Sequence, residues 1–299
     1  MTSQTQCTPA EAVRLFAAQL LREPVAPSRF ASKESTSAHW PEYLTEATCL
    51  GLFMLSACVF TVILQHPASP VRAAISNDSL RRFLTGIAMG LTAISLIYSR
   101  LGKRSGAHIN PVITLTYYRL GKVEARDALA YAGAHFAGGT LGAAVAFLAL
   151  RAELVHPNVN FAATHPGMSG VLIALVAEIA ISFVMMTAVL HFSNSPKLAR
   201  YTGVAAGILV MLFITFEAPI SGMSMNPART FASDFVGMQW SAIWIYFVGP
   251  LVGMLSAAEL YVRMRGPNAV ICAKLDHSGT ARCLFRCGYM ANQGRAQRT

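Results

Sequence analysis

Charged residues are scarce in this chain. Only 13% of its 299 residues are Asp, Glu, Lys or Arg, about half of the roughly 25% that is usual in soluble domains. Acidic residues are the rarer sign, with 14 Asp and Glu against 24 Lys and Arg, and the formal net charge is +10. The chain also lacks a glycine-rich phosphate-binding loop and a recognisable nucleophile–base pair, which argues against an enzyme.

Six long stretches of the chain are almost free of charge, and only one of them carries a carboxylate, Glu178. Most approach or exceed the roughly 20 residues that are needed to cross the hydrocarbon core of a membrane. The alternative, six buried helices of a large soluble protein, fits poorly with a chain of this length. The sequence therefore predicts an all-α membrane protein. Its predicted spans are Ala47–Gln65, Phe83–Ser99, Ala128–Leu150, Val171–Leu190, Tyr201–Phe216 and Phe235–Ala258.

Lys and Arg are distributed unevenly between the two sides of this topology. If the N-terminus lies in the cytoplasm, the cytoplasmic segments hold nineteen of the 24 basic residues. This bias follows the positive-inside rule, and it predicts that both termini are cytoplasmic. The positive net charge then reflects topology and contact with anionic lipid, with no nucleic-acid partner.

The ends of the chain differ from its middle. Residues 1–41 lack the apolar core of a cleavable signal peptide, and Thr8 with Glu11 forms a capping box. We expect a cytoplasmic amphipathic helix and linker in residues 1–41, a membrane domain in 42–263, and a basic, Cys-containing cytoplasmic tail in 264–299.

The membrane domain contains an internal repeat. Glu46 lies early in the first span and Glu178 early in the fourth, and each half continues with a short phrase, SGAHINPV at Ser105–Val112 and SGMSMNPAR at Ser221–Arg229. Three crossings per half place the two halves in opposite orientations. Short segments interrupted by Gly and Pro at matching positions of two inverted halves point to a pore or binding site near the membrane midplane.

The repeated phrase has a clear chemistry. An Asn at a helix N-cap accepts a backbone N–H through its side-chain oxygen and keeps its NH2 group for the lumen, and Pro suits the first helical turn. Two half-helices that begin this way direct their positive ends at the midplane, which opposes cations. Two Asn donors also orient passing water against proton relay. The predicted midplane residues are Asn110, Pro111, Val112, Asn226, Pro227 and Ala228.

These two boxes, with the two acids, resemble the paired signature motifs of the aquaporin (major intrinsic protein) family, over roughly residues 42–263. The resemblance implies an aquaporin-like bundle of six transmembrane helices and two re-entrant half-helices, assembled as a homotetramer. It also implies that Glu46, Glu178 and His108 brace the re-entrant loops. The first box reads Asn-Pro-Val, where the family usually has Asn-Pro-Ala, and we expect a bacterial-type member in an inner membrane.

The resemblance also assigns four residues to the selectivity filter. These are Met89, Ile214, Met223 and Arg229, although ungapped counting from the first box would select Gly90 in place of Met89. Water-selective members typically have an aromatic residue and a His at the positions of Met89 and Ile214. We therefore expect a wider, more apolar and more deformable constriction. Thr230 and the Tyr246–Phe247 pair instead follow the water-channel pattern.

Together these features predict a passive channel for water that excludes protons and ions. Passage of other small neutral solutes, such as glycerol, ammonia, peroxide or metalloid acids, is an open hypothesis. The alternatives are a solute facilitator with little water selectivity, a coupled transporter and a structural junction protein. Near the pore, we expect Glu217 to contact loop backbone or Arg229, and His135 to be a packing residue.

The tail carries a group of soft ligands, Cys272, His277, Cys283 and Cys287. Thiolates and imidazole are ligands for zinc or iron, and four of them complete a tetrahedral site. The spacing lacks a Cys-x-x-Cys pair, so a redox thiol or an ordinary basic tail are alternatives. No other cofactor is expected.

Overall fold

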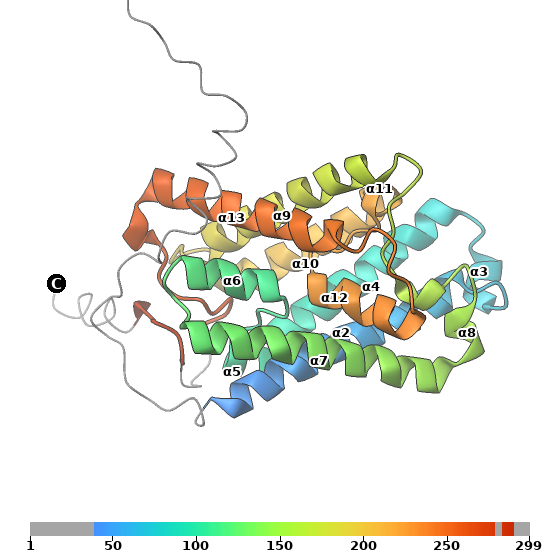
Figure 1. Ribbon diagram of the computed structural model, residues 1–299, viewed down its shortest axis with the longest axis horizontal. Coiled ribbons are helices and arrows are strands. Elements are labelled where there is room, and N and C mark those ends of the chain that lie inside the picture. The colour runs from blue at the N-terminus through green and yellow to red at the C-terminus, as the bar shows by residue number, and fades with distance from the viewer. Residues whose placement is uncertain (1–38, 279–282, 290–299) are drawn as a thin grey trace, which may run out of the picture.

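The computed structural model describes residues 39–278 and 283–289. Within these residues, six helical segments are long and apolar enough to cross a membrane (Figure 1). They are α2 (Trp40–Gln65), α4 (Asp78–Tyr98), α7 (Ala125–Leu150), α9 (Val171–Ser193), η3 (Ala199–Tyr201) with α10 (Thr202–Phe216), and α13 (Ile245–Arg265). The predicted all-α membrane fold is confirmed. The predicted N-terminal helix lies outside the described residues.

Two half-length helices, α6 (Pro111–Arg119) and α12 (Pro227–Gly237), lie inside the bundle and enter it from opposite ends (Figure 1). Both follow an extended loop, so each half of the chain contributes one re-entrant segment. Short helices lie in the connections between these elements: α3 (Pro70–Ala74), α5 (Arg100–Ser105), α8 (Ala152–Val155), η2 (Asn160–Ala162) and α11 (Ala218–Ser221). A further one, η4 (Pro267–Ala269), follows the last span.

The sixth span, α13, begins ten residues later than the predicted span Phe235–Ala258. Phe235 was expected to open it, but this residue belongs to α12, and α13 begins only at Ile245. Met238 ends α12 with a left-handed backbone, φ 52°. Apolar residues continue through this turn, so hydrophobicity alone does not mark the boundary between the half-helix and the span.

Glycines bring three pairs of spans into close backbone contact. A Cβ atom at Gly51 of α2 would lie 2.9 Å from the carbonyl oxygen of Gly138 on α7, and one at Gly90 of α4 would lie 2.6 Å from that of Gly207 on α10. In α13, a Cβ at Gly249 would lie 2.7 Å from the Cβ of Glu178. Small residues of this kind allow helices to pack tightly in lipid. The spans therefore form a close-fitting wall around the half-helices.

Candidate pore between two re-entrant half-helices

Each half-helix begins at the Asn of its box. The side-chain oxygen of Asn110 accepts a hydrogen bond from the backbone N–H of Val112 at 2.9 Å. That of Asn226 accepts from Ala228 at 3.1 Å and from Arg229 at 3.3 Å. Pro follows each Asn, at the first helical position, where a backbone N–H would have no acceptor within the helix. The two helix N-termini therefore meet inside the bundle, and each is capped by the side chain of its Asn.

The NH2 groups of the two asparagines bind across the boundary between the halves. Asn110 Nδ2 donates to the carbonyl oxygen of Met225 at 2.7 Å, and Asn226 Nδ2 donates to that of Ile109 at 2.8 Å. The expectation that both NH2 groups are free for the lumen is therefore wrong in part. Because an amide NH2 carries two hydrogens, each Asn keeps a second donor, and the reciprocal bonds fix its orientation.

The two loops that precede the half-helices share an unusual backbone. Ala107 and Ile109 have φ angles of 57° and 52°, and Met223 and Met225 have 53° and 54° at the matching positions of the second loop. A left-handed backbone at non-glycine residues costs roughly 1–2 kcal/mol each. Such conformations persist where surrounding contacts hold them, and they gather at functional sites.

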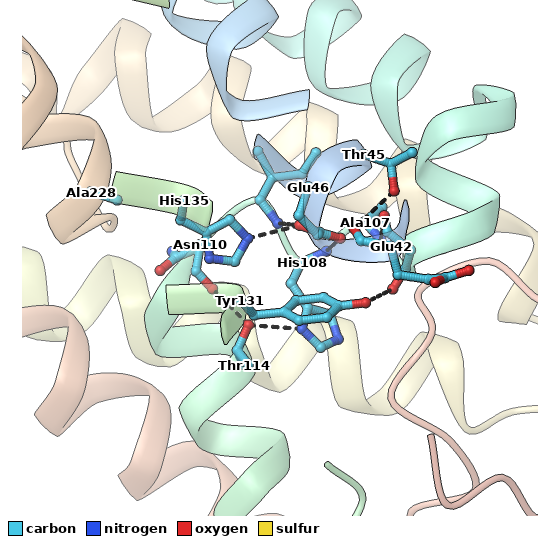
Figure 2. Close-up of polar contacts among 12 residues, drawn as sticks. Glu42, Thr45, Glu46, Ala107, His108, Asn110, Thr114, Tyr131, His135 and Ala228 are labelled. Atoms are coloured by element: carbon cyan, nitrogen blue, oxygen red, sulfur yellow. Dashed lines mark hydrogen bonds and ion pairs between the residues drawn. The ribbon is translucent and has the colours of Figure 1, made fainter. Parts of the chain in front are cut away.

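A buried carboxylate holds the first loop. Glu46 on α2 accepts hydrogen bonds from the backbone N–H groups of His108 at 3.0 Å and Ile109 at 2.6 Å. Its carboxylate also lies 2.8 Å from Nε2 of His135 on α7, and neither side chain is exposed. Figure 2 shows the ring of His135 pointing at the carboxylate of Glu46. His135 is therefore a partner of the buried acid, and its expected role as a packing residue is wrong.

The second loop is held in a related way. Glu178 on α9 accepts from the backbone N–H groups of Ser224 at 2.7 Å and Met225 at 2.8 Å. Its third partner is the hydroxyl of Ser221 at 2.8 Å, whereas the third partner of Glu46 is a histidine from another span. An acid at membrane depth needs such partners, so both halves use one acid to fix one loop.

Two tyrosines add a brace that the sequence reading missed. Tyr131 on α7 donates its hydroxyl to the carbonyl oxygen of Ser105 at 2.6 Å, and Tyr246 on α13 donates to that of Ser221 at 2.5 Å. Ser105 and Ser221 open the two repeated phrases. Aligning the halves on these phrases, and not only on their acids, would have brought the two tyrosines into near register.

His108 connects the first loop with the tail. Its Nε2 lies 2.9 Å from the carbonyl oxygen of Ala273. Its Nδ1 lies 2.8 Å from the hydroxyl of Thr114 on α6, as Figure 2 shows. Since a carbonyl oxygen only accepts, Nε2 carries the hydrogen and Nδ1 accepts from Thr114. The residue thus joins the loop, the half-helix and the chain beyond the last span.

The two half-helices and their loops line one cavity of about 660 Å³. Asn110 and Asn226 lie on its wall, as do all four residues of the predicted filter, Met89, Ile214, Met223 and Arg229. One end is lined by Gln65 and Asp78 beside the α2–α4 connection, and Leu275 of the tail lines the other. Methionines are prominent in the wall: Met89, Met185, Met223, Met225 and Met254.

The structure distinguishes the two candidates for the filter position on α4. Met89 lines the cavity, with its sulfur 3.9 Å from the hydroxyl of Ser56. Gly90 instead faces α10 at Gly207. Arg229 extends from the first turn of α12, with Nη1 3.3 Å from the hydroxyl of Ser233. The wall near the filter thus combines thioether and aliphatic groups with one guanidinium.

Glu217 lies at the end of α10, beside this wall, and is 8% exposed. Two contacts were expected for it, with loop backbone or with Arg229. In the described part of the chain no hydrogen bond joins its carboxylate to Arg229, whereas Ser221, which opens the second repeated phrase, acts on its pKa through hydrogen bonding. Burial raises the pKa of Glu217 from its ordinary value of 4.5 to about 7, and the charge of Glu178 adds to the effect.

The four soft ligands of the tail come together outside the membrane bundle. One ligand atom from each of Cys272, His277, Cys283 and Cys287 lies within 4.8 Å of the others. The group does not line the cavity, but Leu275, which belongs to the same segment, does.

Residues 33–261 match the family described as "Major intrinsic protein". The chain belongs to this family. It is 34% identical to "Aquaporin NIP1-4" of Oryza sativa subsp. japonica over 60% of its own length and 64% of that relative. It is 32% identical to "Aquaporin NIP2-3" of Zea mays over 76% of its own length and 74% of that relative. The first of these matches thus spans less than two thirds of the relative.

The fold is also that of a solved member. The structure of the aquaglyceroporin from Plasmodium falciparum superposes with a TM-score of 0.65, 16% identity, and coverage of 77% of this chain and 98% of that one. The named sequence relatives come from plants, so the bacterial-type assignment stays a prediction. Members of the family are channels, and the aquaporin-like bundle is confirmed.

Proposed function

We propose that this protein is a passive channel for water and small neutral solutes that excludes protons and ions. The observation that carries the proposal is the arrangement of Asn110 and Asn226. Each caps a half-helix, each is fixed by a carbonyl of the opposite loop, and both line the same cavity. The names of the plant relatives, which are called aquaporins, support the same function.

The exclusion of cations follows from charge. Both half-helices direct their positive N-termini at the midplane, and Arg229 adds a guanidinium to the cavity wall. A neutral molecule with a lone pair can accept from the remaining N–H of each Asn, whereas a cation meets positive potential from both sides. Glu46 and Glu178 use their oxygens on the loop backbone, which favours a bracing role over ion coupling.

The filter bears on which solutes pass. Met89 and Ile214 supply only apolar surface to the cavity, and a thioether side chain adapts its shape readily. We infer that glycerol or urea enters as well as water. If so, vesicles that contain the protein swell faster than empty vesicles in gradients of either solute.

The test is stopped-flow light scattering on vesicles that contain the purified protein, first with an impermeant osmolyte and then with glycerol. We expect water flux well above that of empty vesicles, linear in the gradient and insensitive to an applied ion gradient. Flux equal to that of lipid alone would remove the channel function and favour a structural role. Saturable flux that depends on an ion gradient would favour a coupled transporter.

Substitution of Arg229 in the same assay tests the filter. Arg229→Val should preserve water flux and increase leakage of solutes and ions, because it removes the positive group from the wall. Leu260→Ala, on the exposed face of α13, is the control. Equal selectivity in both variants would contradict this role for Arg229.

We further propose a homotetramer with both termini in the cytoplasm. The tetramer follows from the family resemblance, and the orientation follows from the excess of Lys and Arg on one side. A bacterial inner membrane remains the expected location. Chemical cross-linking in the membrane tests the tetramer, and protease access to the tail in sealed vesicles tests the orientation.

A further inference from the structure

The tail after α13 folds back onto the end of the bundle. Beyond η4 it forms no helix or strand in residues 270–278 and 283–288. Nevertheless Val270, Cys272, Ala273, Leu275 and Phe285 are each at most 6% exposed. The tail lacks the hydrogen-bond ladder of a helix or strand, and in small folds with a limited core a disulfide or a structural metal often supplies the missing constraint.

Four side chains of the tail have the arrangement of a metal site. The sulfur atoms of Cys272 and Cys283 are 3.5 Å apart, and Nε2 of His277 lies 3.0 Å from the sulfur of Cys272 and 3.4 Å from that of Cys287. Around a tetrahedral zinc ion, bond lengths of about 2.3 Å to sulfur and about 2.0 Å to nitrogen place neighbouring ligand atoms about 3.5–3.8 Å apart. The observed cluster needs only small side-chain movements to reach that geometry.

The surroundings also suit a thiolate-ligated ion. The backbone N–H of Lys274 lies 3.5 Å from the sulfur of Cys272, and a donor at this position stabilises a thiolate. Three thiolates around Zn²⁺ leave one net negative charge, and the ammonium group of Lys122 is close enough to Cys272 and Cys287 to interact with it electrostatically. Soft sulfur ligands select zinc over magnesium or calcium.

The ligands flank two side chains at the inner end of the cavity: Leu275, which lines it, and Phe285, which stacks on the cavity-lining His108. The stretches around these two side chains are the covering segments. Leu275 lies between Cys272 and His277, and Phe285 lies between Cys283 and Cys287. An ion bound to all four would therefore tie one covering segment to the other.

Both covering segments contact the first re-entrant loop. The backbone N–H of Leu275 donates to the carbonyl oxygen of Gly106 at 3.1 Å, and the Leu275 side chain lines the cavity. Phe285 stacks on the ring of His108, with centroids 5.1 Å apart and planes 15° apart. The carbonyl of Ala273 accepts from His108 at 2.9 Å. These contacts place the tail directly against the loop that forms half of the pore.

The same tail is anchored to the second half of the bundle. The backbone N–H of Ile271 donates to the side chain of Asn194 at 2.6 Å, and the hydroxyl of Tyr289 donates to the carbonyl of Ser193 at 2.6 Å. Both partners lie at the end of α9. The tail therefore bridges the inner end of the cavity from the end of α9 to the loop at His108.

We propose that Cys272, His277, Cys283 and Cys287 bind one zinc ion, which holds the tail across the inner end of the pore and restricts flux through it. Binding releases the thiol protons to solvent. Loss of the ion frees the two covering segments from each other and increases flux. The metal site rests on the cluster alone, whereas its effect on flux rests also on the proposed channel function.

The first experiment measures metal binding by the full chain, purified under reducing conditions without chelator. We expect about one zinc ion per chain by elemental analysis, as a single tetrahedral site requires. Cobalt(II) should replace zinc and give the visible absorption of tetrahedral thiolate-ligated cobalt. Cys283→Ser and His277→Gln should lose both signals. Cys49→Ala, a buried cysteine of α2 outside the cluster, should retain them.

Three results would overturn the site. The wild-type chain could take up neither zinc nor cobalt in titration, the two ligand variants could bind as the control does, or intact mass could show a disulfide between Cys272 and Cys283 in the reduced preparation. Because the wild-type titration uses no variant, the test holds even if a ligand variant fails to fold.

The second experiment compares water flux through vesicles with zinc-loaded protein and with protein treated with a chelator, checked for intact fold by circular dichroism. We expect several-fold higher flux after removal of zinc. Leu275→Ala should raise the flux of the zinc-loaded protein, and Leu260→Ala should not. Equal flux in the two states refutes the restriction of the pore. Flux no higher than that of lipid in both states refutes the channel, and the metal stoichiometry still decides the site.

Discussion

Asn110 and Asn226 each donate a side-chain N–H to the carbonyl oxygen of the residue that precedes the other. The two halves of the chain are thus joined by a reciprocal pair of hydrogen bonds between residues 115 and 117 positions apart. The pair positions both amides before any permeant arrives, so the remaining N–H of each points in a fixed direction.

Asn226→Asp tests this pair. The substitution replaces a donor with a carboxylate oxygen that faces the carbonyl of Ile109, so it removes one bond and introduces repulsion. We expect a loss of stability of about 1–3 kcal/mol and strongly reduced water flux, measured by thermal unfolding in detergent and by stopped-flow scattering. Asn268→Asp, at an exposed position after α13, should change neither. Similar behaviour of the two variants would rule out a role for the pair.

His135 provides a second test, at the acid that braces the first loop. His135→Leu removes from buried Glu46 the side-chain partner at 2.8 Å and leaves that oxygen with the N–H of Ile109 alone; we expect a stability loss of about 3 kcal/mol. His135→Gln should restore part of it, because the amide can donate to the carboxylate. His156→Leu, in the connection between α8 and η2, is the control. Thermal unfolding that does not distinguish His135→Leu from this control would show that the contact contributes little.

Substitutions of a packed and of an open helical glycine should have opposite effects on stability. Gly90→Ala places a Cβ 2.6 Å from the carbonyl of Gly207, which forces the helices apart beside Met89 and costs about 1–3 kcal/mol. Gly133→Ala on α7 meets nothing within 4 Å, so it should stabilise the helix by up to about 1 kcal/mol. Thermal midpoints of the two variants check the prediction, and equal shifts would contradict it.

Glu217 predicts a pH dependence of stability. Its pKa of about 7 in the folded state lies above the ordinary value of 4.5, so the folded protein binds the proton more tightly than the unfolded chain. Stability therefore falls as pH rises from about 4.5 to about 7, by up to a few kcal/mol. Glu217→Gln should flatten this part of the profile, followed as thermal midpoint against pH. An unchanged slope in the variant would assign the dependence to other groups.

The sequence predicted the spans and the boxes because each depends on local signals. Uncharged runs marked all six helices, although the boundary at Phe235 was wrong because apolar residues continue from α12 through the turn. The repeated phrases located both N-caps, since capping involves residues only two or three positions apart.

Contacts between distant elements could not be predicted from the sequence. His135 lies 89 positions from Glu46, and nothing in its own helix indicates that partner. The reciprocal use of the Asn NH2 groups depends on how closely two loops approach, which no pattern encodes. The sequence did name Cys272, His277, Cys283 and Cys287 as a possible metal set, because their residue types alone suggested it, but the distances between them follow from an irregular segment without periodicity.

The methionines on the cavity wall give the pore a chemical sensitivity. Met89 and Met223 lie at the predicted filter, and Met225 adjoins Asn226. Oxidation turns a thioether into a polar, chiral sulfoxide, and any oxidant small enough to enter the pore reaches these sulfur atoms. The helix of Met89 packs closely against α10 at Gly90 and Gly207, so the added oxygen would point into the cavity. Exposure to an oxidant would therefore change the polarity and width of the pore at its filter, and with them the set of solutes that pass.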